Sequence, residues 1–361
     1  MNGKFHQNLA WLNLDGSPAA FQPNPLFEGP VRSIRGLEGS PSGQPLLIAG
    51  NFGQAMGYGC TGLARLNPDG TFDPAFRPIV TQANGTVADL RDAETDDNLP
   101  GKYNIMGIFA KIADSSHALQ LRNAFARLNN DGSLDSDFNA QFSIPSSSNI
   151  CVNAGGSMGG GNYGMAGYYL ESGANDRGFG CVLNQVGNQQ NYMLLDGEVK
   201  CATGLSDGRI LFGGKFTQVT YPVTASRGHI LAITPSFSLD SSFAGDGANG
   251  PIHALRAQGD DFTGKVLLGG NFTTYNGISR NNVARLNVDG SLDPIFNPGI
   301  GTNNKVHAIA WTHWGNNGPT IGKALLGGAF TTYDGVSRPG IARILATDGS
   351  VNPAIFLLLL N

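Results

Sequence analysis

Charge is scarce in this sequence, and a long apolar run, a paired cysteine motif and a hydrophobic leader are missing from it. Charged residues are 14% of the total and the formal net charge is only −4. The chain therefore has no broad basic field, and no nucleic-acid partner is expected. Disorder is not expected either, because 40% of the residues are apolar, and a disordered chain needs few apolar residues.

The apolar runs are too short for a membrane-spanning helix, so no membrane insertion is expected. The longest run, 355–360, falls far short of the roughly 20 residues that cross a bilayer. The first residues, MNGKFHQNLAWLN, contain no hydrophobic segment of a secretory signal and resemble the middle of a repeat. The chain is then either a processed or excerpted piece of something longer, or a protein exported without a Sec leader.

Signals of zinc or catalytic chemistry are weak. The sequence has no C-x-x-C pair, no G-x-S-x-G motif, no glycine-rich phosphate loop, and no glutamate paired with a histidine at motif spacing. We therefore predict that the chain is not an enzyme. The four cysteines are expected to be small buried apolar residues, with a disulfide left open: Cys60, Cys151, Cys181 and Cys201.

The sequence is rich in glycine, with 52 residues, and it repeats itself. The segment 264–298, GKVLLGGNFTTYNGISRNNVARLNVDGSLDPIFNP, returns almost intact at 322–356. A fixed internal period decides the architecture before any other feature. We place the repeat units at about 30–80, 85–142, 147–195, 198–247, 250–300 and 304–361, after a half unit at 1–25.

Each unit contains about four strand-sized apolar runs separated by turn residues, which predicts a four-stranded antiparallel meander. The second run is continuously apolar, as in Val266-Leu267-Leu268, which indicates a strand covered on both faces. Sheets stacked face to face in a repeat predict an all-β chain, a single β-propeller domain over 1–361. Seven blades with one incomplete are expected, with six blades and a surplus half-blade as the alternative. The half-blade's open edge would invite pairing with another chain.

The repeat also resembles a known family. The motif R-L-N-x-D-G-S-L-D-x-x-F, following G-G-x-F-T-x-Y-N-G, is similar to the delta-60 repeats of bacterial surface and secreted proteins. The similarity covers nearly the whole chain and is weakest over 149–191. It implies a β-propeller at the cell surface or outside the cell, often as part of a very large surface protein, and no established catalytic activity.

We therefore expect a non-enzymatic structural or interaction module, a building block of a surface layer, appendage, filament or adhesin. Its partners would be other protein chains, copies of itself included, and glycans remain open as ligands. Two alternatives stay open: a carbohydrate-binding propeller or propeller hydrolase, and a component of a virion tail or fibre.

Three sets of residues are candidates for binding. In the N-x-D-G-x-x-D element, oxygen side chains alternate as in a calcium loop, but a turn explains them better: Asp69, Asp73, Asp131, Asp135, Asp289 and Asp293. The second residue of the V-x-A-h segment is basic in four units and is Ala88 in another, and the four would form a partial basic ring at a channel mouth: Arg32, Lys200, His253 and His307. The loops after the second strand combine aromatic and guanidinium groups, as interface anchors do: Tyr58, Tyr221, Tyr275, Tyr333, Arg227, Arg280 and Arg338.

A recurrent arginine in the third strand is expected to hold the fourth segment of its unit. Arg65, Arg127 and Arg285 each have an aspartate eight residues downstream, so a charge-assisted clasp is predicted. Arg343 faces Asn352 instead, and the last unit should be less tightly clasped.

Overall fold

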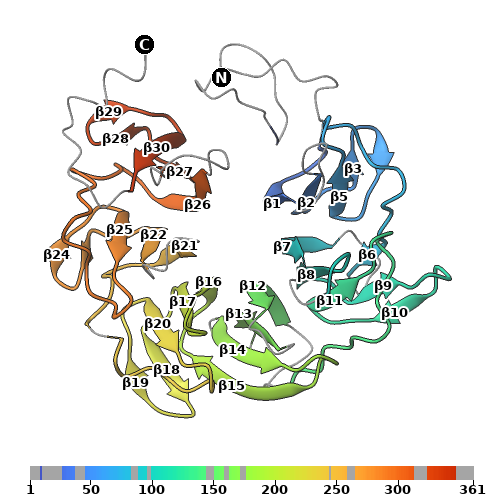
Figure 1. Cartoon of the computed structure of the whole chain (residues 1–361), viewed down its shortest axis with the longest axis horizontal. Helices are drawn as coiled ribbons and strands as arrows, with labels where there is room; N and C mark the ends of the chain where they lie inside the picture. The colour runs from blue at the N-terminus through green and yellow to red at the C-terminus, as the bar shows by residue number, and fades with distance from the viewer. Residues whose placement is uncertain are drawn as a thin grey trace. The chain divides into compact units, whose positions relative to one another are not determined.

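The computed structural model describes residues 9, 27–36, 45–82, 88–95, 99–143, 150–157, 162–170, 176–243, 245–257, 265–312 and 323–346. These residues form β-strands, bridges, turns and irregular segments, with no α-helix among them (Figure 1). The chain divides into two compact units: the first holds 1–165 and 182–190, the second 166–181 and 191–361. Each unit is described by itself.

Two repeated sheets lie wholly in the first unit, and each is an antiparallel meander of three strands. Their strands are β1 (Val31–Gly36), β2 (Leu46–Gly50) and β5 (Leu63–Leu66), then β7 (Asp89–Thr95), β8 (Tyr103–Ile108) and β11 (Phe125–Leu128). A small sheet of order β10-β9-β6 joins β6 (Val80–Thr81), β9 (Lys111–Ala113) and β10 (Leu119–Leu121).

The boundary between the units runs through the third repeated sheet. This sheet contains β12 (Ile150–Ser157), β13 (Tyr163–Tyr169), β14 (Arg177–Leu183) and β15 (Gln189–Leu195) in that order. It continues into β18 (Gln218–Tyr221) and β19 (Ala225–Ser226).

Three more antiparallel meanders lie in the second unit. The first has β16 (Val199–Gly204), β17 (Ile210–Gly214) and β20 (Ile230–Ile233). The others have β21 (Ile252–Ala257), β22 (Val266–Gly270) and β25 (Val283–Leu286), then β26 (Val306–Thr312), β27 (Lys323–Gly328) and β30 (Ile341–Leu345).

The first three strands of the predicted meander are confirmed in order and direction. The fourth is mostly reduced to one bridge pair with the third strand: Leu66 with Phe72, Leu128 with Leu134, Ile233 with Leu239 and Leu286 with Leu292. A full fourth strand occurs as β15 in the third sheet. A tight turn precedes these bridges, as predicted: Gly290 has φ +83° and donates its N–H to the Asn287 carbonyl at 3.0 Å. The half unit at 1–25, apart from Leu9, and the last fourth segment at 351–356 lie outside the described residues.

The second strand is buried on both faces, as predicted, in β2, β8, β13, β17 and β22, whereas one face of β27, with Lys323, Leu325 and Gly327, is only half-buried. In β22, Leu268 joins a core cluster with Leu211 and Ile230 of the preceding sheet. Its neighbour Leu267 joins another cluster with Leu326 of the following sheet. Successive side chains of a strand point to opposite faces, so two adjacent leucines serve two cores.

The paired glycines at the end of the second strand allow this close packing. A Cβ on Gly269 would lie 2.6 Å from the Val306 side chain of the next sheet, nearer than real contacts allow. A Cβ on the following Gly270 would overlap the backbone of Pro251 and lie 3.0 Å from the ring of Phe272. The missing side chain of Gly269 therefore lets the next sheet approach, whereas that of Gly270 makes room within its own repeat.

The replacement Gly269→Ala is expected to lower the free energy of unfolding by about 1–3 kcal/mol, because it overfills a packed contact between sheets. Gly327→Ala is the matched control, since Gly327 is the same glycine of the next repeat and its Cβ would meet only Ala308, at 3.8 Å. Urea denaturation of both variants checks this. Equal losses in the two would show that the approach of the sheets is not the cause.

Candidate functional site

The segment between the second and third strands folds into a short hairpin that the sequence analysis treated as a loop. The hairpins are β3 (Gln54–Ala55) with β4 (Tyr58–Gly59), β23 (Thr274–Tyr275) with β24 (Ile278–Ser279), and β28 (Thr332–Tyr333) with β29 (Val336–Ser337). Both turn residues have positive φ, +47° and +76° at Asn276 and Gly277. Positive φ at both central residues is the mark of a type I′ turn, whose backbone twist matches that of the two strands it joins. The dipeptide asparagine–glycine is the strongest sequence signal of such a hairpin.

The residue that follows each of these turns is large, apolar and exposed. It is Tyr58, Ile278 or Val336, with 47%, 52% and 49% of its surface accessible. Other hairpins also carry exposed apolar residues: Leu119 and Leu121 on β10, Tyr221 on β18, and Val223 between β18 and β19. We call this set, with Tyr58, Ile278 and Val336, the hairpin residues. Their exposure recurs with the repeat, so it is a feature of the repeat and not of one loop.

Two of the predicted tyrosine anchors do not belong to this surface. Tyr275 pairs with Ile278 across its hairpin and is fully buried, and its hydroxyl donates to the Gly290 carbonyl at 3.0 Å. Burial raises the pKa of Tyr275, and also that of Tyr333, which holds the same position in the next repeat. The prediction that Tyr275 is a surface anchor is wrong, because residues on facing hairpin strands had been treated as equivalent. Tyr58 corresponds to Ile278, not to Tyr275.

The three predicted arginines lie at the end of the hairpins, and a fourth was missed. Each donates an Nη1 hydrogen bond to the carbonyl of the preceding residue, at 2.7–2.8 Å: Arg122, Arg227, Arg280 and Arg338. The Nε atoms of the first three are buried without a hydrogen-bond partner. Arg122, Arg227 and Arg280 thus each keep one buried N–H group without a hydrogen-bond partner close to the exposed apolar residues.

Tyr221 has an aromatic neighbour that the sequence did not single out. Its ring stacks on Tyr192 of β15, with centroids 4.9 Å apart and an angle of 19° between the planes. Tyr221 is 45% exposed. The pair presents a flat aromatic surface on the second unit.

The basic residues of the first strands occupy one structural position, a β-bulge. The register of the first strand shifts by one residue against the second at Arg32, Lys200, His253 and His307. In the second sheet the bulge lies at Arg91, three residues after Ala88, which the sequence had aligned with the other four. The bulge residue of this sheet is therefore also basic. A bulge leaves its extra residue unpaired and redirects its side chain.

In the first unit, aspartates neutralise the bulge arginines. Asp89 accepts from Arg32 Nε at 2.5 Å and lies 3.0 Å from Arg91 Nη2. Asp92 is bound by Arg35 at 2.8 Å. Both bulge arginines of this unit, Arg32 and Arg91, are therefore already paired with a carboxylate of the same chain.

Among the residues of the second unit that the structure describes, cations outnumber carboxylates around the bulges. Glu198 lies 3.0 Å from Lys200 and 2.9 Å from Lys215. Burial raises the pKa of Glu198, but the two lysines outweigh burial, so the pKa is lowered. The rings of His253 and His307 are 5.3 Å apart. Burial, with help from Lys200, His307 and Lys305, lowers the pKa of His253 to about 4.

The calcium candidates form turns and clasps. Oδ1 of the first aspartate of each element accepts from the backbone and hydroxyl two residues on, which lowers its pKa: Asp69, Asp131 and Asp289. The second aspartate pairs with the third-strand arginine: Asp73, Asp135 and Asp293. No cluster of three or more metal-binding side chains occurs among the residues that the structure describes.

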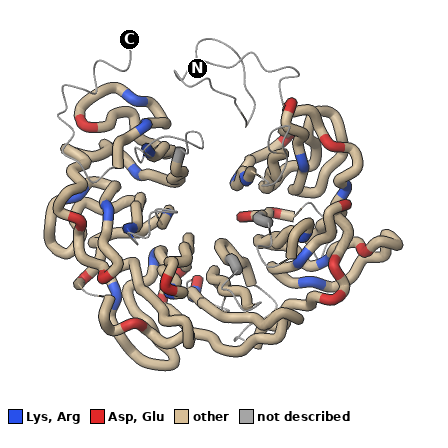
Figure 2. Tube along the Cα trace, in the orientation of Figure 1, with Lys and Arg blue, Asp and Glu red and all other residues tan. Residues whose placement is uncertain are grey.

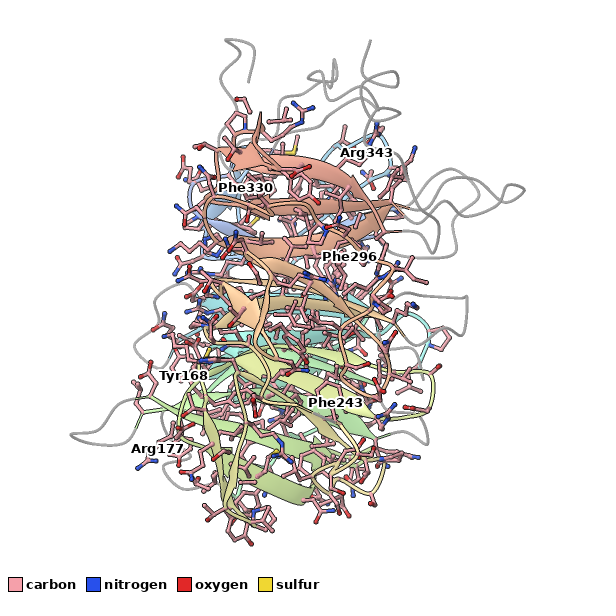
Figure 3. All side chains as sticks on the ribbon, turned by 90° about the vertical axis from the view of Figure 1, so that its left-hand side faces the viewer. Tyr168, Arg177, Phe243, Phe296, Phe330 and Arg343 are labelled. Carbon is pink, nitrogen blue, oxygen red and sulfur yellow. The ribbon has the colours of Figure 1, made fainter. Side chains whose placement is uncertain are left out.

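The clasp predicted for the third-strand arginine is confirmed, and it also reaches the next sheet. Arg285 Nε lies 2.6 Å from Asp293 Oδ2, and Lys265 Nζ lies 2.7 Å from the same oxygen. Nη1 of Arg285 donates to the carbonyl of Ala346, beyond β30. The guanidinium also covers the ring of Phe296, which Figure 3 labels, at 5.4 Å.

Two further clasps repeat this geometry in the first unit, and a variant occurs in the second. Arg65 and Arg127 lie 2.7 Å from Asp73 and Asp135, and donate to Tyr103 at 3.1 Å and Tyr163 at 3.0 Å. Where the third strand has Ala232, Arg209 binds Asp240 from the start of β17, at 3.0 Å. The looser clasp expected at Arg343 stays a prediction, because Asn352 lies outside the described residues. Figure 2 marks the basic and acidic positions along the described part of the chain.

The repeated antiparallel meanders and their stacked cores define a class, the β-propeller repeat proteins. A family model described as "Domain of unknown function (DUF5122) beta-propeller" matches residues 46–76, 101–138, 205–243, 263–296 and 322–354. The chain is a β-propeller repeat protein. These matches include the third strands of five repeats, and four of them also include the clasp aspartate.

Several solved structures are similar at low sequence identity. One is the extracellular domain of a protein described as a hybrid two-component system of B. thetaiotaomicron: 11% identity, TM-score 0.48, 90% of this chain and 34% of that chain covered. Another is the WD40 β-propeller domain of Doa1, with 12% identity, TM-score 0.36, and 62% and 58% covered. A protein of unknown function from Bacteroides caccae has 12% identity, TM-score 0.39, and 73% and 80% covered.

The chain thus spans about a third of the length of the first of these structures. No curated protein matches the sequence. No helix among the described residues is long and apolar enough to cross a membrane.

Proposed function

We propose that this protein is a non-enzymatic interaction module that works outside the cytoplasm and assembles with further copies of itself. Such a module is a building block of a surface layer, appendage, filament or adhesin. The extracellular location rests on the resemblance of its repeats to the delta-60 family and on its low charge. The assembly rests on the hairpin residues.

The observation that carries the proposal is the recurrent exposure of one hairpin position. Large apolar side chains at the surface gain about 1.5–3 kcal/mol each when they are fully buried, so a repeated set of them favours association. In the second unit, Ile278 and Val336 lie two residues before Arg280 and Arg338. Arginine is enriched among the residues that carry the binding energy of protein interfaces.

Light scattering over a range of concentrations tests this proposal. We expect the mass of the wild-type protein to rise with concentration, and the double variant Ile278→Ser/Val336→Ser to stay monomeric. The matched control is Val288→Ser/Ile295→Ser, which changes two exposed apolar residues outside the hairpins. It should assemble like the wild type. A wild-type monomer at every concentration, or an equal loss in the control, would rule the proposal out.

A second candidate function, carbohydrate binding, is favoured by the stacked pair of Tyr192 and Tyr221. Exposed tyrosine rings give a flat apolar surface with a polar edge, which suits the face of a sugar ring. A glycan array compares the wild type with Tyr221→Ala. Binding that disappears in the variant supports this function, and an array without binding rejects it.

A further inference from the structure

We propose that the strand bulges of the second unit form a binding site for a small oxyanion, a carboxylate, sulfate or phosphate group. The ligating groups would be Lys200, His253 and His307, with Lys305 beside them. This site is separate from the hairpin residues and goes beyond the proposed assembly.

The first argument is geometric. The three residues occupy the same bulge position on β16, β21 and β26, and β21 packs against both of the other strands. The rings of His253 and His307 are 5.3 Å apart, and Lys305 directly precedes β26. His307 is exposed, so a ligand from solvent can reach these side chains.

The second argument is that the first unit already contains an internal equivalent of the ligand. There, Asp89 places its carboxylate between the bulge residues Arg32 and Arg91, although it is only 7% exposed. A buried carboxylate is stable only when cations and hydrogen bonds surround it. In the first unit, cations at the bulge position thus bind an oxyanion, the carboxylate of Asp89.

The third argument is the charge balance of the second unit. The charged groups that act on His253 are Lys200, His307, Lys305 and Glu198. Glu198 is the acid among them, and it already lies within 3.0 Å of Lys200 and 2.9 Å of Lys215. An oxyanion from solvent would supply the negative charge that Asp89 supplies in the first unit.

The pH dependence of binding follows from the two histidines. Burial first, and then the neighbouring cations, lower the pKa of His253 to about 4, and the pKa of His307 is lowered for the same reasons. Both rings are therefore neutral at pH 7. A bound anion favours the protonated rings and raises their pKa, so binding takes up protons. Affinity should rise as the pH falls from 7 toward 4.

Titration of the histidine ring signals by NMR with sodium sulfate, at constant ionic strength, tests the site. Saturating shifts are expected at His253 and His307, with a raised pKa at both, and none at His117 and His229. The variant Lys200→Gln/Lys305→Gln should bind sulfate at least about tenfold more weakly, a loss of about 1.4 kcal/mol. Lys111→Gln, in the first unit, is the matched control and should bind as the wild type does.

A second variant imitates the first unit. His307→Asp places a carboxylate beside His253, as Asp89 lies beside Arg32, and should abolish sulfate binding while raising the pKa of His253. Acetate titrated in place of sulfate shows whether a carboxylate suffices or a sulfate group is required; either result supports an oxyanion site. Shifts that rise linearly without saturation, or saturating binding that both variants retain, would overturn it.

Discussion

Asp293→Ala is expected to lower the free energy of unfolding by about 3–5 kcal/mol, because it removes a buried carboxylate that both Arg285 and Lys265 bind. Arg285 and Asp293 are both fully buried, and Lys265 lies 2.7 Å from the same carboxylate oxygen. Removing the acid therefore takes a buried ion-pair partner from both cations. Denaturation by urea at neutral pH measures the loss.

Asp73→Ala is the matched control, because Arg65 and Asp73 form the same clasp with side chains that are 12% and 16% exposed and without a neighbouring lysine. Water screens this pair, so its loss should be smaller. Equal losses in the two variants would mean that burial of the charges does not set the strength of the clasp.

The clasp also predicts how stability depends on pH. Burial raises the pKa of Asp293, but Lys265 and Arg285 outweigh it, and the folded-state pKa is lowered. A carboxyl with a lowered folded pKa contributes stability that is present above its unfolded pKa, about 3.9, and is lost as the pH falls through the folded value. The difference in stability between wild type and Asp293→Ala should therefore shrink below about pH 4.

The second large effect is expected at Tyr275. Tyr275→Ala removes a fully buried aromatic ring and should cost about 3–5 kcal/mol, whereas Tyr275→Phe loses only the hydrogen bond to Gly290, about 0.5–1.5 kcal/mol. Ile278→Ala changes the residue that faces Tyr275 across the hairpin but lies at the surface. Thermal unfolding should show less than about 0.5 kcal/mol of change for it.

These three variants distinguish the two faces of the hairpin. If Tyr275→Ala were as stable as the wild type, Tyr275 would be a surface anchor after all, as the sequence indicated. If Ile278→Ala were strongly destabilised, the exposed position would belong to the core and would not be available to a partner.

Periodicity made much of the fold predictable from the sequence. The apolar run of β22 indicated a strand covered on both faces, and Leu267 and Leu268 do serve two cores. The eight-residue spacing of Arg285 and Asp293 indicated their pairing, because both lie on segments that a tight turn brings together. The hydrogen bond from Arg285 to the carbonyl of Ala346 could not be predicted, because a contact between repeats has no fixed spacing in the sequence.

The candidate site was less predictable, because side-chain direction changes with each residue. Tyr58 and Tyr275 seemed equivalent in the sequence but lie on opposite strands of their hairpins, and the asparagine–glycine turn signal at Asn276 would have separated them. Arg91 was missed because the sequence places Ala88 at this position, three residues before the bulge. The excess of cations near His253 depends on distances between sheets.

Amide hydrogen exchange at low and high protein concentration tests the central claim, that the hairpins are the surface through which this protein assembles. We predict slower exchange at high concentration at residues 274–280 and 332–338, and unchanged exchange in the turn at 287–291. Uniform exchange at both concentrations, or protection confined to the turn, would contradict the account.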